Sequence, residues 1–552
     1  MRNYSVSKVG SYFMLTIQSL YLRLKRRKLT RLARAGCYKE AINAYKKWGI
    51  AGTDFAADIV GYCHYELSNF EAAIIHLKNR LEIYPNDYNS RLFLARSFKA
   101  LDKKNEAIDQ LMKCLELHTE QSSRILDYLL PLAAQINDEI IYRNTFSNIE
   151  KAVEKQNLSN VNLAKILFYQ RSDSEITHGM LEGMQLGRFY GAKQITETGC
   201  GNYISLGQPE KLRFVRIEDG SDIWVDTCLP YVAEIPDATV MSGSSLILVG
   251  DKILSDHLAH KQYGHYVDMQ YDSNVLARRN DALLIKKPVS ENKIEEGIML
   301  CGLVSDAYGH WFAEFLPKLR FFEKHPRFSQ LPIIVDDEMP QSHYDFLIAL
   351  VSNPIYRLHK GSSLKVRNLL IAPTDTFFPV DLLSGHSVPF EEQSSLTIGA
   401  LKYIGAKIAD RFATNVNPTA RIFLSRRHST WRRLSNEQEI IALLREFNFE
   451  VVFSEDFSFE EQVKIFKNAA FIVAPNGSAL NNLIFSNPNV KVLMFGQKNL
   501  FNWGGWFGSF MELGYRIPYL GGAAIGNEKA KHSDYTIHAS LVRQIVTEML
   551  DF

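Results

Sequence analysis

Residues 421–495 read RIFLSRRHSTWRRLSNEQEIIALLREFNFEVVFSEDFSFEEQVKIFKNAAFIVAPNGSALNNLIFSNPNVKVLMF. This stretch contains short apolar runs that alternate with amphipathic segments. The runs are Ile422–Leu424, Val451–Phe453, Ala470–Ala474 and Val490–Phe495. Continuous apolar strands that alternate with helices are typical of a parallel sheet covered by helices on both faces. We therefore predict a doubly wound α/β domain in the C-terminal part of the chain.

Two helix starts in this stretch carry the pattern of a capping box, in which a Ser at the cap is followed three residues later by Glu or Gln. Ser435 is followed by Gln438, and Ser458 by Glu461. We predict a helix from Ser435 to about Phe447 and a second one that begins at Ser458.

A similar alternation begins upstream, at Gly297, and predicts a second α/β unit. Its predicted strands are Ile298–Val304 and Leu331–Val335, and its predicted helices are Tyr308–Glu323, Ser342–Val351 and one that ends near Phe412. Two such units in series place a cleft between them, and ligands of such sheets bind beyond the carboxyl ends of the strands. The loops after Val304, Leu424 and Ala474 are therefore where we expect the chemistry.

Segments on either side complete the domain organisation. Short β-rich runs punctuated by Gly, Pro and Asp lie between residues 195 and 287. Near the C-terminus, Ile537, Leu541, Ile545 and Met549 share a helical spacing, and we expect this helix to pack across both α/β domains. The predicted domains are a leader (1–28), a helical region (29–180), a β-rich segment with the first α/β domain (181–395), and the second α/β domain with its closing helix (396–552).

The helical region contains an internal repeat. Three copies of one pattern occupy Gly36–Tyr45, Asn69–Leu77 and Lys104–Leu111. The copies resemble the tetratricopeptide repeat, which has a period of 34 residues and a small residue where its helices cross. Ala41, Ala73 and Ala107 occupy that position here. Stacked repeats form a groove that binds partner proteins. The alternative is a helical extension that only stabilises the neighbouring domain.

The net charge of +2 is the sum of unlike regions. The chain has 552 residues with 63 Lys and Arg against 61 Asp and Glu, and residues 1–39 hold ten of the cations and no acid. The rest of the chain therefore sums to −8. A basic leader on an acidic body argues against a dedicated nucleic-acid binder.

The leader is a basic amphipathic segment. Phe13, Ile17, Leu20, Tyr21 and Leu24 fall at helical spacing, and the apolar stretch is too interrupted for a membrane span or a secretory signal. Such a helix either lies on an anionic membrane surface or packs as a capping helix on the next domain. We expect a cytoplasmic protein, with possible peripheral contact to the inner face of the membrane.

Metal and disulfide chemistry lack their usual signatures. The six cysteines are scattered and form no Cys-x-x-Cys pair, which argues against zinc ribbons and a disulfide framework. Asp336-Asp337-Glu338 is the densest carboxylate cluster after a strand, and we interpret it as a solvated turn. No metal or other cofactor is expected.

The loop after Leu424 is rich in arginine. Arg426, Arg427, Arg432 and Arg433 fall within Ser425–Arg433, together with His428. Guanidinium groups bind phosphate through paired hydrogen bonds, and a helix beginning at Ser435 adds backbone N–H donors. The loop is a candidate pyrophosphate site; the alternative is a solvated basic loop.

The other two loops add smaller signals. After Ala474, Gly477 permits close approach of a ligand to the backbone, and Asn476, Ser478 and Asn481 supply hydrogen-bonding groups. After Val304, His310 and Glu314 are four residues apart on one helix face, where one could remove a proton from an acceptor hydroxyl while the other orients it. The alternative is an ordinary pair in which Glu314 bridges Lys318.

Together these segments resemble glycosyltransferase family 61, of the capsular polysaccharide biosynthesis type. The matching motifs are Tyr308–Leu319, Arg421–Ser425 with Arg432–Glu437, and Phe459–Gln462 followed by Ala474–Asn482. The resemblance implies a GT-B fold, inversion at the anomeric carbon, a nucleotide-sugar donor on the C-terminal domain, an acceptor on the N-terminal domain, and no essential metal. Where the family usually has His before the Gly of the third motif, this chain has Asn476.

The sequence therefore predicts an inverting glycosyltransferase that transfers a sugar to a cell-surface glycan of the capsular or lipopolysaccharide type. Glu314 or His310 is the base; Arg426, Arg427, Arg432 and Arg433 hold the diphosphate; Asn476, Gly477, Ser478 and Asn481 surround the donor. Two alternatives stay open. One is a non-catalytic scaffold with a degenerate transferase domain, and the other is a transferase that acts on a protein or lipid acceptor.

Overall fold

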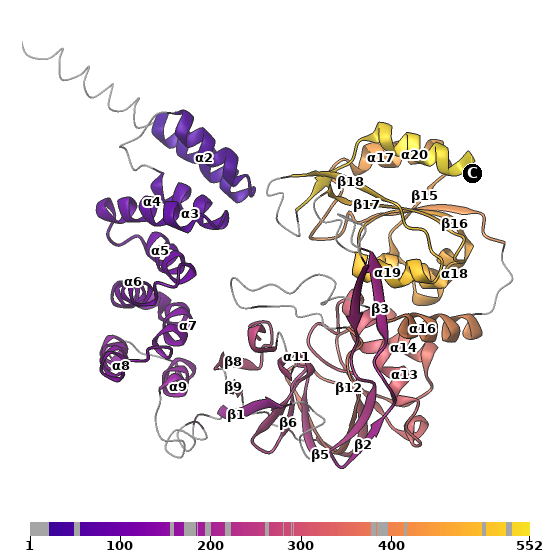
Figure 1. Ribbon diagram of the computed structural model, residues 1–552, viewed down its shortest axis with the longest axis horizontal. Coiled ribbons are helices and arrows are strands. Elements are labelled where there is room, and N and C mark those ends of the chain that lie inside the picture. Colours follow the sequence, from indigo (N-terminus) through magenta and orange to yellow (C-terminus); the bar gives the residue numbers. More distant parts are fainter. Residues whose placement is uncertain are drawn as a thin grey trace, which may run out of the picture. The chain divides into compact units, whose positions relative to one another are not determined.

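The computed structural model divides into two units, Met1–Met180 and Leu181–Phe552 (Figure 1). It describes residues 21–48, 56–154, 159–170, 181, 184, 186–193, 200–215, 222–259, 264–279, 281–286, 288, 290, 292–376, 382, 396–412, 417–498, 504–525 and 533–551. No helix among these residues is both long enough and apolar enough to cross a membrane.

The first unit is a series of helices in which each packs against the next. After a helix over residues 21–34 come α2 (Tyr38–Lys47), α3 (Ala57–Glu66), α4 (Phe70–Ile83), α5 (Tyr88–Ala100), α6 (Lys104–Leu117), α7 (Ser122–Ala133), α8 (Glu139–Glu154) and α9 (Asn160–Tyr169). Ala41, Ala73 and Ala107 are all fully buried. The small residues therefore lie between packed helices, and the predicted tetratricopeptide-like repeat is confirmed.

The described part of the leader packs on this repeat. Leu29 and Ala33 are buried in one cluster with Ala41 of α2 and Val60 of α3. Arg26 adds an ion pair with Asp58. The predicted boundary at residue 28 falls inside this helix, which serves as the capping helix that was one of the two alternatives. Phe13, Ile17 and Leu20 of the predicted apolar stripe lie outside the described residues.

The C-terminal sheet of the second unit is parallel, as predicted. Its strands follow the order β15-β14-β16-β17-β18-β19, and only the last pair is antiparallel. They are β14 (Ala420–Leu424), β15 (Glu450–Val452), β16 (Ala469–Pro475), β17 (Lys491–Gln497), β18 (Tyr519–Ala524) and β19 (Tyr535–Thr536).

Helices cover both faces of this sheet (Figure 1). One face packs α17 (Glu437–Glu446) and α20 (Ala539–Asp551), while the other packs α16 (Ile398–Arg411), α18 (Phe459–Asn468), α19 (Gly504–Glu512) and the tight helix η8 (Ser478–Phe485). The doubly wound arrangement is therefore present in this half of the unit.

One of the two predicted capping boxes is present and the other is wrong. Ser458 and Glu461 exchange the expected hydrogen bonds at the start of α18. In contrast, α17 begins at Glu437 without a side-chain cap. The backbone N–H of Ser435 donates instead to the carbonyl of Tyr535, because the chain there runs alongside β19.

The predicted packing of the C-terminal helix across both domains is also wrong. Helix α20 buries Val542 and Val546 in a cluster whose other members all belong to the C-terminal half of the chain. Leu541, which was expected on the buried stripe, is 43% exposed. Ile537, Ile545 and Met549 of the predicted stripe do pack in or against this cluster, so the stripe is largely buried but within one domain.

The other sheet is larger and more mixed than predicted. Its order is β12-β11-β10-β13-β5-β6-β7-β1-β9-β8, with β2 paired to β5. Its strands are β1 (Leu186–Lys193), β2 (Asn202–Ser205), β5 (Tyr231–Met241), β6 (Ile247–Val249), β7 (Lys252–Leu254), β8 (Val275–Arg278), β9 (Ala282–Lys286), β10 (Asn292–Met299), β11 (Ile333–Asp336), β12 (Ile355–Leu358) and β13 (Ser363–Ile371); β3 (Lys211–Val215) and β4 (Asp222–Asp226) form a separate hairpin.

Only four neighbouring strands of this sheet, β10 to β13, form the predicted parallel part. Beyond them β5 pairs antiparallel to β13, so the β-rich segment extends the same sheet. The prediction of a doubly wound parallel sheet therefore holds for β10 to β13 but is wrong for the domain as a whole. Helix α14 (Gln341–Leu350) follows β11 as expected.

Asp336, at the end of β11, is not in a solvated turn. It is 5% exposed and accepts hydrogen bonds from the backbone N–H of Gly243 (2.6 Å) and Gly302 (2.8 Å) and from the hydroxyl of Ser305 (2.7 Å). Burial raises the pKa of its carboxyl group, against the effect of these donors. Asp336 therefore fastens the loop that leads to the first motif.

Candidate active site

The first motif forms an irregular helix at the carboxyl end of β10. It runs through a short α segment (α12, Tyr308–His310), a π-helical turn (Trp311–Phe315), a tight turn (Leu316–Lys318) and α13 (Leu319–Phe322). Pro317 has no N–H to donate within the helix and its ring crowds the preceding turn, which accounts for the irregularity. π-Helical turns are frequent at functional sites.

His310 and Glu314 form the pair that their spacing predicted. Nδ1 of His310 hydrogen-bonds to Oε1 of Glu314, whose side chain is 6% exposed. The alternative partner of Glu314 was Lys318, but among the described residues the ion pairs of Glu314 are with histidines and none is with Lys318. The structure therefore favours the His–Glu pair over the ordinary helix pair.

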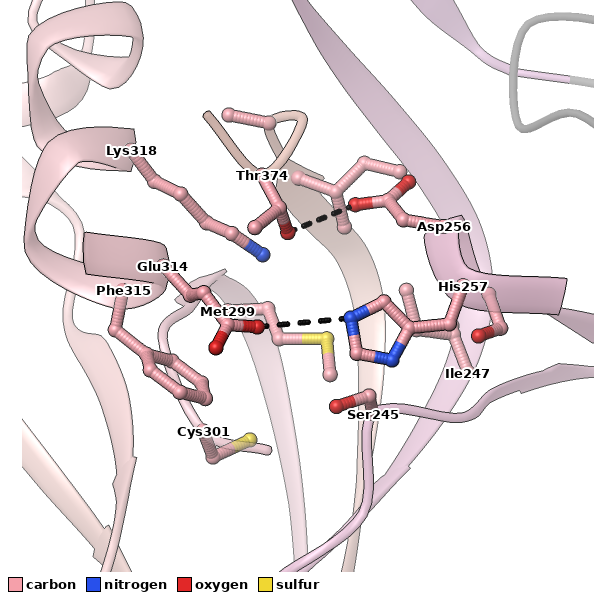
Figure 2. Close-up of a pocket in the computed structure, with 13 residues that line it drawn as sticks. Ser245, Ile247, Asp256, His257, Met299, Cys301, Glu314, Phe315, Lys318 and Thr374 are labelled. Atoms are coloured by element: carbon pink, nitrogen blue, oxygen red, sulfur yellow. Dashed lines mark hydrogen bonds and ion pairs between the residues drawn. The ribbon is translucent and has the colours of Figure 1, made fainter. Parts of the chain in front are cut away.

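A second histidine, which the sequence analysis missed, approaches the other oxygen of Glu314. Nε2 of His257 lies 3.6 Å from Oε2 (Figure 2). His257 belongs to the short helix α11 (Asp256–Ala259), which follows β7. It is far from the first motif in the sequence and no local pattern marks it, so only the fold brings it to Glu314.

Glu314 is held in its charged form. Burial raises the pKa of its carboxyl group, but the charge of His310 and the contact with His257 outweigh that effect and leave the pKa below its ordinary value. That effect belongs to the charged form of His310; in the neutral tautomer the Nδ1–H still donates to this carboxylate and the lone pair lies on Nε2. The arrangement is therefore suited to a base at Nε2 of His310, with Glu314 fixing its tautomer.

A small cavity of about 40 Å³ opens beside Glu314 on the side of His257 (Figure 2). Polar and charged side chains supply much of its lining, namely Ser245, Ser255, Asp256, His257, Glu314, Lys318 and Thr374. The Thr374 hydroxyl donates to Asp256 over 3.3 Å, which ties α11 to the loop after β13. This volume accommodates a few water molecules or a small functional group, but no sugar ring.

The loops of the two sheets meet beside the first motif. A Cβ at Gly309 would lie 3.3 Å from the Cβ of Ser478, and the Tyr308 hydroxyl donates to the side-chain oxygen of Asn482. Asn482 in turn donates to Gln462 over 2.9 Å. The third motif therefore lies directly against the start of the first, as expected for loops at the carboxyl ends of strands.

Two of the four predicted arginines lie at this junction. A Cβ at Gly477 would lie 1.8 Å from Nη1 of Arg426, so only glycine admits the guanidinium there. Burial and, second to it, the charge of Arg426 lower the pKa of Arg432 to about 10. The pKa of Arg426 is also lowered by burial. Arg426 thus lies beside Gly477, and Arg432 is a second partly desolvated cation close enough to Arg426 for their charges to interact.

The other two arginines are held by carboxylates. Nε of Arg427 lies 3.2 Å from Glu437, and Arg433 lies 2.8 Å from Asp534. Glu437 is buried at the start of α17 and also accepts from the Ser425 hydroxyl over 2.8 Å. The structure therefore does not gather Arg427 and Arg433 with the pair at Gly477.

The predicted residues of the third motif also divide. Gly477 and Ser478 face the junction. Asn476 is 7% exposed, and its backbone N–H donates to the carbonyl of Phe495 over 2.6 Å. Asn481 is fully buried within η8. Asn476 and Asn481 are buried within the turn, as is Gly477, whereas Ser478 is partly exposed.

No group of three or more His, Cys, Asp and Glu side chains arranged for a metal ion is found among the described residues. The absence of an essential metal stays a prediction.

The His–Glu pair lies where the loops of the two sheets meet, which is a place where α/β enzymes bind their ligands. The family comparison is more specific. Residues 308–493 match the family Glycosyltransferase 61 and include the three motifs from Tyr308 to Asn482. This part of the chain is a glycosyltransferase family 61 domain, as its motifs predicted. His257 lies outside the matched residues.

The helical first unit resembles solved structures of MamA. One, from Desulfovibrio magneticus RS-1, is 15% identical, with 25% of this chain and 78% of MamA covered and a TM-score of 0.21. Another, MamA AMB-1, is 19% identical, with coverages of 26% and 97% and a TM-score of 0.18. Likenesses this distant carry no functional argument. No curated protein matches the chain.

Proposed function

We propose that this glycosyltransferase inverts the anomeric carbon as it transfers a sugar from a nucleotide-sugar donor to a hydroxyl of a cell-surface glycan of the capsular or lipopolysaccharide type. The observation that carries the proposal is the juxtaposition of the His310–Glu314 pair with the turn at Gly477–Ser478, beside which Arg426 lies. A base and an anion site on opposite sides of one junction are what a single displacement requires.

In this reaction the acceptor oxygen attacks the anomeric carbon while the bond from that carbon to the diphosphate oxygen breaks. The proton of the acceptor hydroxyl passes to Nε2 of His310, and the nucleoside diphosphate leaves with the bonding electron pair. Glu314 stabilises the imidazolium that forms, since its carboxylate already bonds Nδ1. One displacement inverts the configuration of the carbon.

The leaving diphosphate needs positive charge, and Arg426 and Arg432 supply it in this proposal. Both guanidinium groups are partly desolvated, which strengthens their attraction to an anion. The backbone N–H groups around Gly477 and Ser478 add donors. This neutralisation replaces a metal ion, so the reaction is expected to continue in EDTA.

The proposal includes a GT-B arrangement, in which each of the two sheets binds one substrate. The donor would bind the parallel sheet that carries Arg426 and Gly477, and the acceptor would bind the mixed sheet that carries His310. Tyr308 and Asn482 link the two sides of the site.

The proposal is tested in two stages. A thermal-shift screen of nucleotide sugars identifies the donor, since a bound ligand stabilises the folded state. Transfer to glycan acceptors is then assayed with that donor, and the anomeric configuration of the product is determined by NMR. A retained configuration contradicts the single displacement. Full activity of both His310→Ala and Glu314→Gln contradicts the assignment of the base.

Two alternatives have their own outcomes. Asn476, in place of the family's usual His, favours a degenerate transferase domain that acts as a scaffold; donor binding without transfer or donor hydrolysis supports it. The repeat region favours a protein acceptor, and linkage analysis of the product distinguishes a glycosylated polypeptide from a glycan or lipid-linked glycan.

Peripheral binding to an anionic membrane is the last part of the proposal. Leu29 and Ala33 of the helix over residues 21–34 are buried, whereas Arg23, Arg27 and Arg31 are exposed. Charge reversal of these three residues is expected to abolish binding to vesicles that contain phosphatidylglycerol, and unchanged binding contradicts the proposal. Deletion of residues 1–28 would cut this helix, so substitutions are the cleaner test.

A further inference from the structure

The carboxylate of Glu314 is buried and bridges two imidazoles from different parts of the chain. Its Oε1 bonds His310, four residues away, and its Oε2 faces Nε2 of His257 at 3.6 Å. A buried carboxylate is costly unless its oxygens have partners. Each oxygen of Glu314 has one, and they come from separate elements, which fixes the carboxylate from two directions.

We propose that His257 is a positioning residue for this transferase: it holds Glu314 so that Glu314 can orient His310. The inference rests on the proposed function, because it assigns His257 a part in the same proton transfer. With only His310 as partner, Glu314 would be free to rotate toward the cavity beside it. The imidazole of His257 borders that cavity and blocks this movement (Figure 2).

The position of His257 is itself secured. Asp256, the preceding residue, accepts a hydrogen bond from Thr374, which follows β13. The β7 strand before α11 pairs with β6 and β1 of the mixed sheet. A residue on a short helix whose N-terminal end is anchored in this way can hold a neighbouring side chain to a fraction of an ångström, which is the precision that a proton transfer needs.

The charged groups around Glu314 come from three elements. His257 and Asp256 lie on α11, His310 on α12, and Lys318 on the turn that follows the π-helical segment. Only the two histidines form ion pairs with Glu314 among the described residues. Replacement of His257 therefore removes one of two partners and leaves the other in place.

The test compares His257→Ala with His257→Asn, whose side-chain amide retains an N–H donor. We expect His257→Ala to lower kcat by about 10- to 100-fold, the range typical of groups that orient a reacting residue, with the KM for the donor changed less than about twofold. We expect His257→Asn to recover at least part of the loss. The matched control is Ser255→Ala, which lines the same cavity, does not contact Glu314, and is expected to keep full activity.

Chemical rescue separates positioning from a merely structural role. Loss of the His257 ring enlarges the cavity next to Glu314, so added imidazole should restore kcat of His257→Ala and should leave Ser255→Ala unchanged. A loss of activity in His257→Ala that neither imidazole nor Asn restores, together with a lowered Tm, overturns the inference in favour of folding. Full activity of His257→Ala beside an inactive His310→Ala also overturns it and leaves the proposed function intact. Absence of transfer by the wild-type enzyme refutes the proposed function instead.

Discussion

The two charged loops at the centre of the second unit hold their side chains in different ways. In the first motif, His310 and Glu314 lie four residues apart on one helix and hydrogen-bond to each other, so the predicted contact is present. In the arginine loop, carboxylates from elsewhere hold half of the predicted set, with Glu437 on Arg427 and Asp534 on Arg433. Charge density in a sequence therefore does not indicate which charges are available to a ligand.

The largest effect is expected from a substitution in the first motif. His310→Ala should lower kcat by about 10²- to 10⁴-fold, since the base that accepts the acceptor proton is lost. Steady-state transfer rates with saturating donor and acceptor measure it. His359→Ala is the control. His359 is a solvent-exposed histidine that pairs with Asp337 and has no part in the proposed proton transfer, so this variant should keep full activity. A His310→Ala variant within threefold of wild type would contradict the assignment.

The next effect tests the division within the arginine loop. Arg426→Ala and Arg432→Ala should each raise the KM for the donor by about 10- to 100-fold, the loss of a charged hydrogen bond worth about 1.5–3 kcal/mol. Arg427→Ala and Arg433→Ala should change it less than about threefold, since both side chains already bind carboxylates. Equal effects of all four substitutions would contradict the division of the loop into two donor-binding arginines and two arginines held by carboxylates. Donor titrations at fixed acceptor give each KM.

A smaller effect is expected from Gly477→Ala. The added Cβ would meet Nη1 of Arg426, so the guanidinium must move and donor KM should rise by about tenfold. The backbone of Gly477 is extended, so the effect is steric rather than conformational. Gly405→Ala is the matched control. Gly405 lies in helix α16, and an added Cβ would make an ordinary contact of 3.4 Å with Ile484 of η8, so activity should not change. An unchanged donor KM in Gly477→Ala would contradict the position of Arg426 beside Gly477 or its role in donor binding.

The smallest effect concerns stability beneath the first motif. His343 is buried with its ring 5.6 Å from that of Tyr308, and burial lowers its pKa to about 4 from an ordinary value of 6.5. The unfolded state therefore binds a proton that the folded state does not, and the free energy of unfolding falls as pH falls from about 6.5 toward 4. The expected loss is about 2 kcal/mol between pH 7 and pH 5.

Urea denaturation of the wild type and of His343→Gln at both pH values measures this difference. The variant should lose about 2 kcal/mol less than the wild type over the same interval, because glutamine does not titrate. Equal losses would show that His343 is protonated in the folded protein.

The local features of the fold could be read from the sequence. The strand β16, the capping box at Ser458 and the buried Ala73 each depend on residues within one or two turns of one another. Hydrophobic periodicity and capping act over that range, so they predict elements and their faces well. The parallel C-terminal sheet follows from them directly.

The mixed sheet could not be read in the same way. Strand β5 pairs with β13, whose residues come more than a hundred positions later. The apolar pattern of β5 indicates that one face of the strand is buried. It does not indicate which sheet edge the strand joins, because any exposed edge offers the same backbone hydrogen bonds. Helix α20 shows the same limit, since its spacing did not indicate that it packs within one domain.

The sequence by itself determined the family, the doubly wound sheet at residues 420–497 and the His310–Glu314 pair, because each rests on local spacing. Tertiary structure alone decided that His257 completes this pair and that Arg426 lies beside Gly477 while Arg427 does not. The physical reason is competition. A charged side chain takes the partner that packing brings nearest, and that partner can come from any part of the chain.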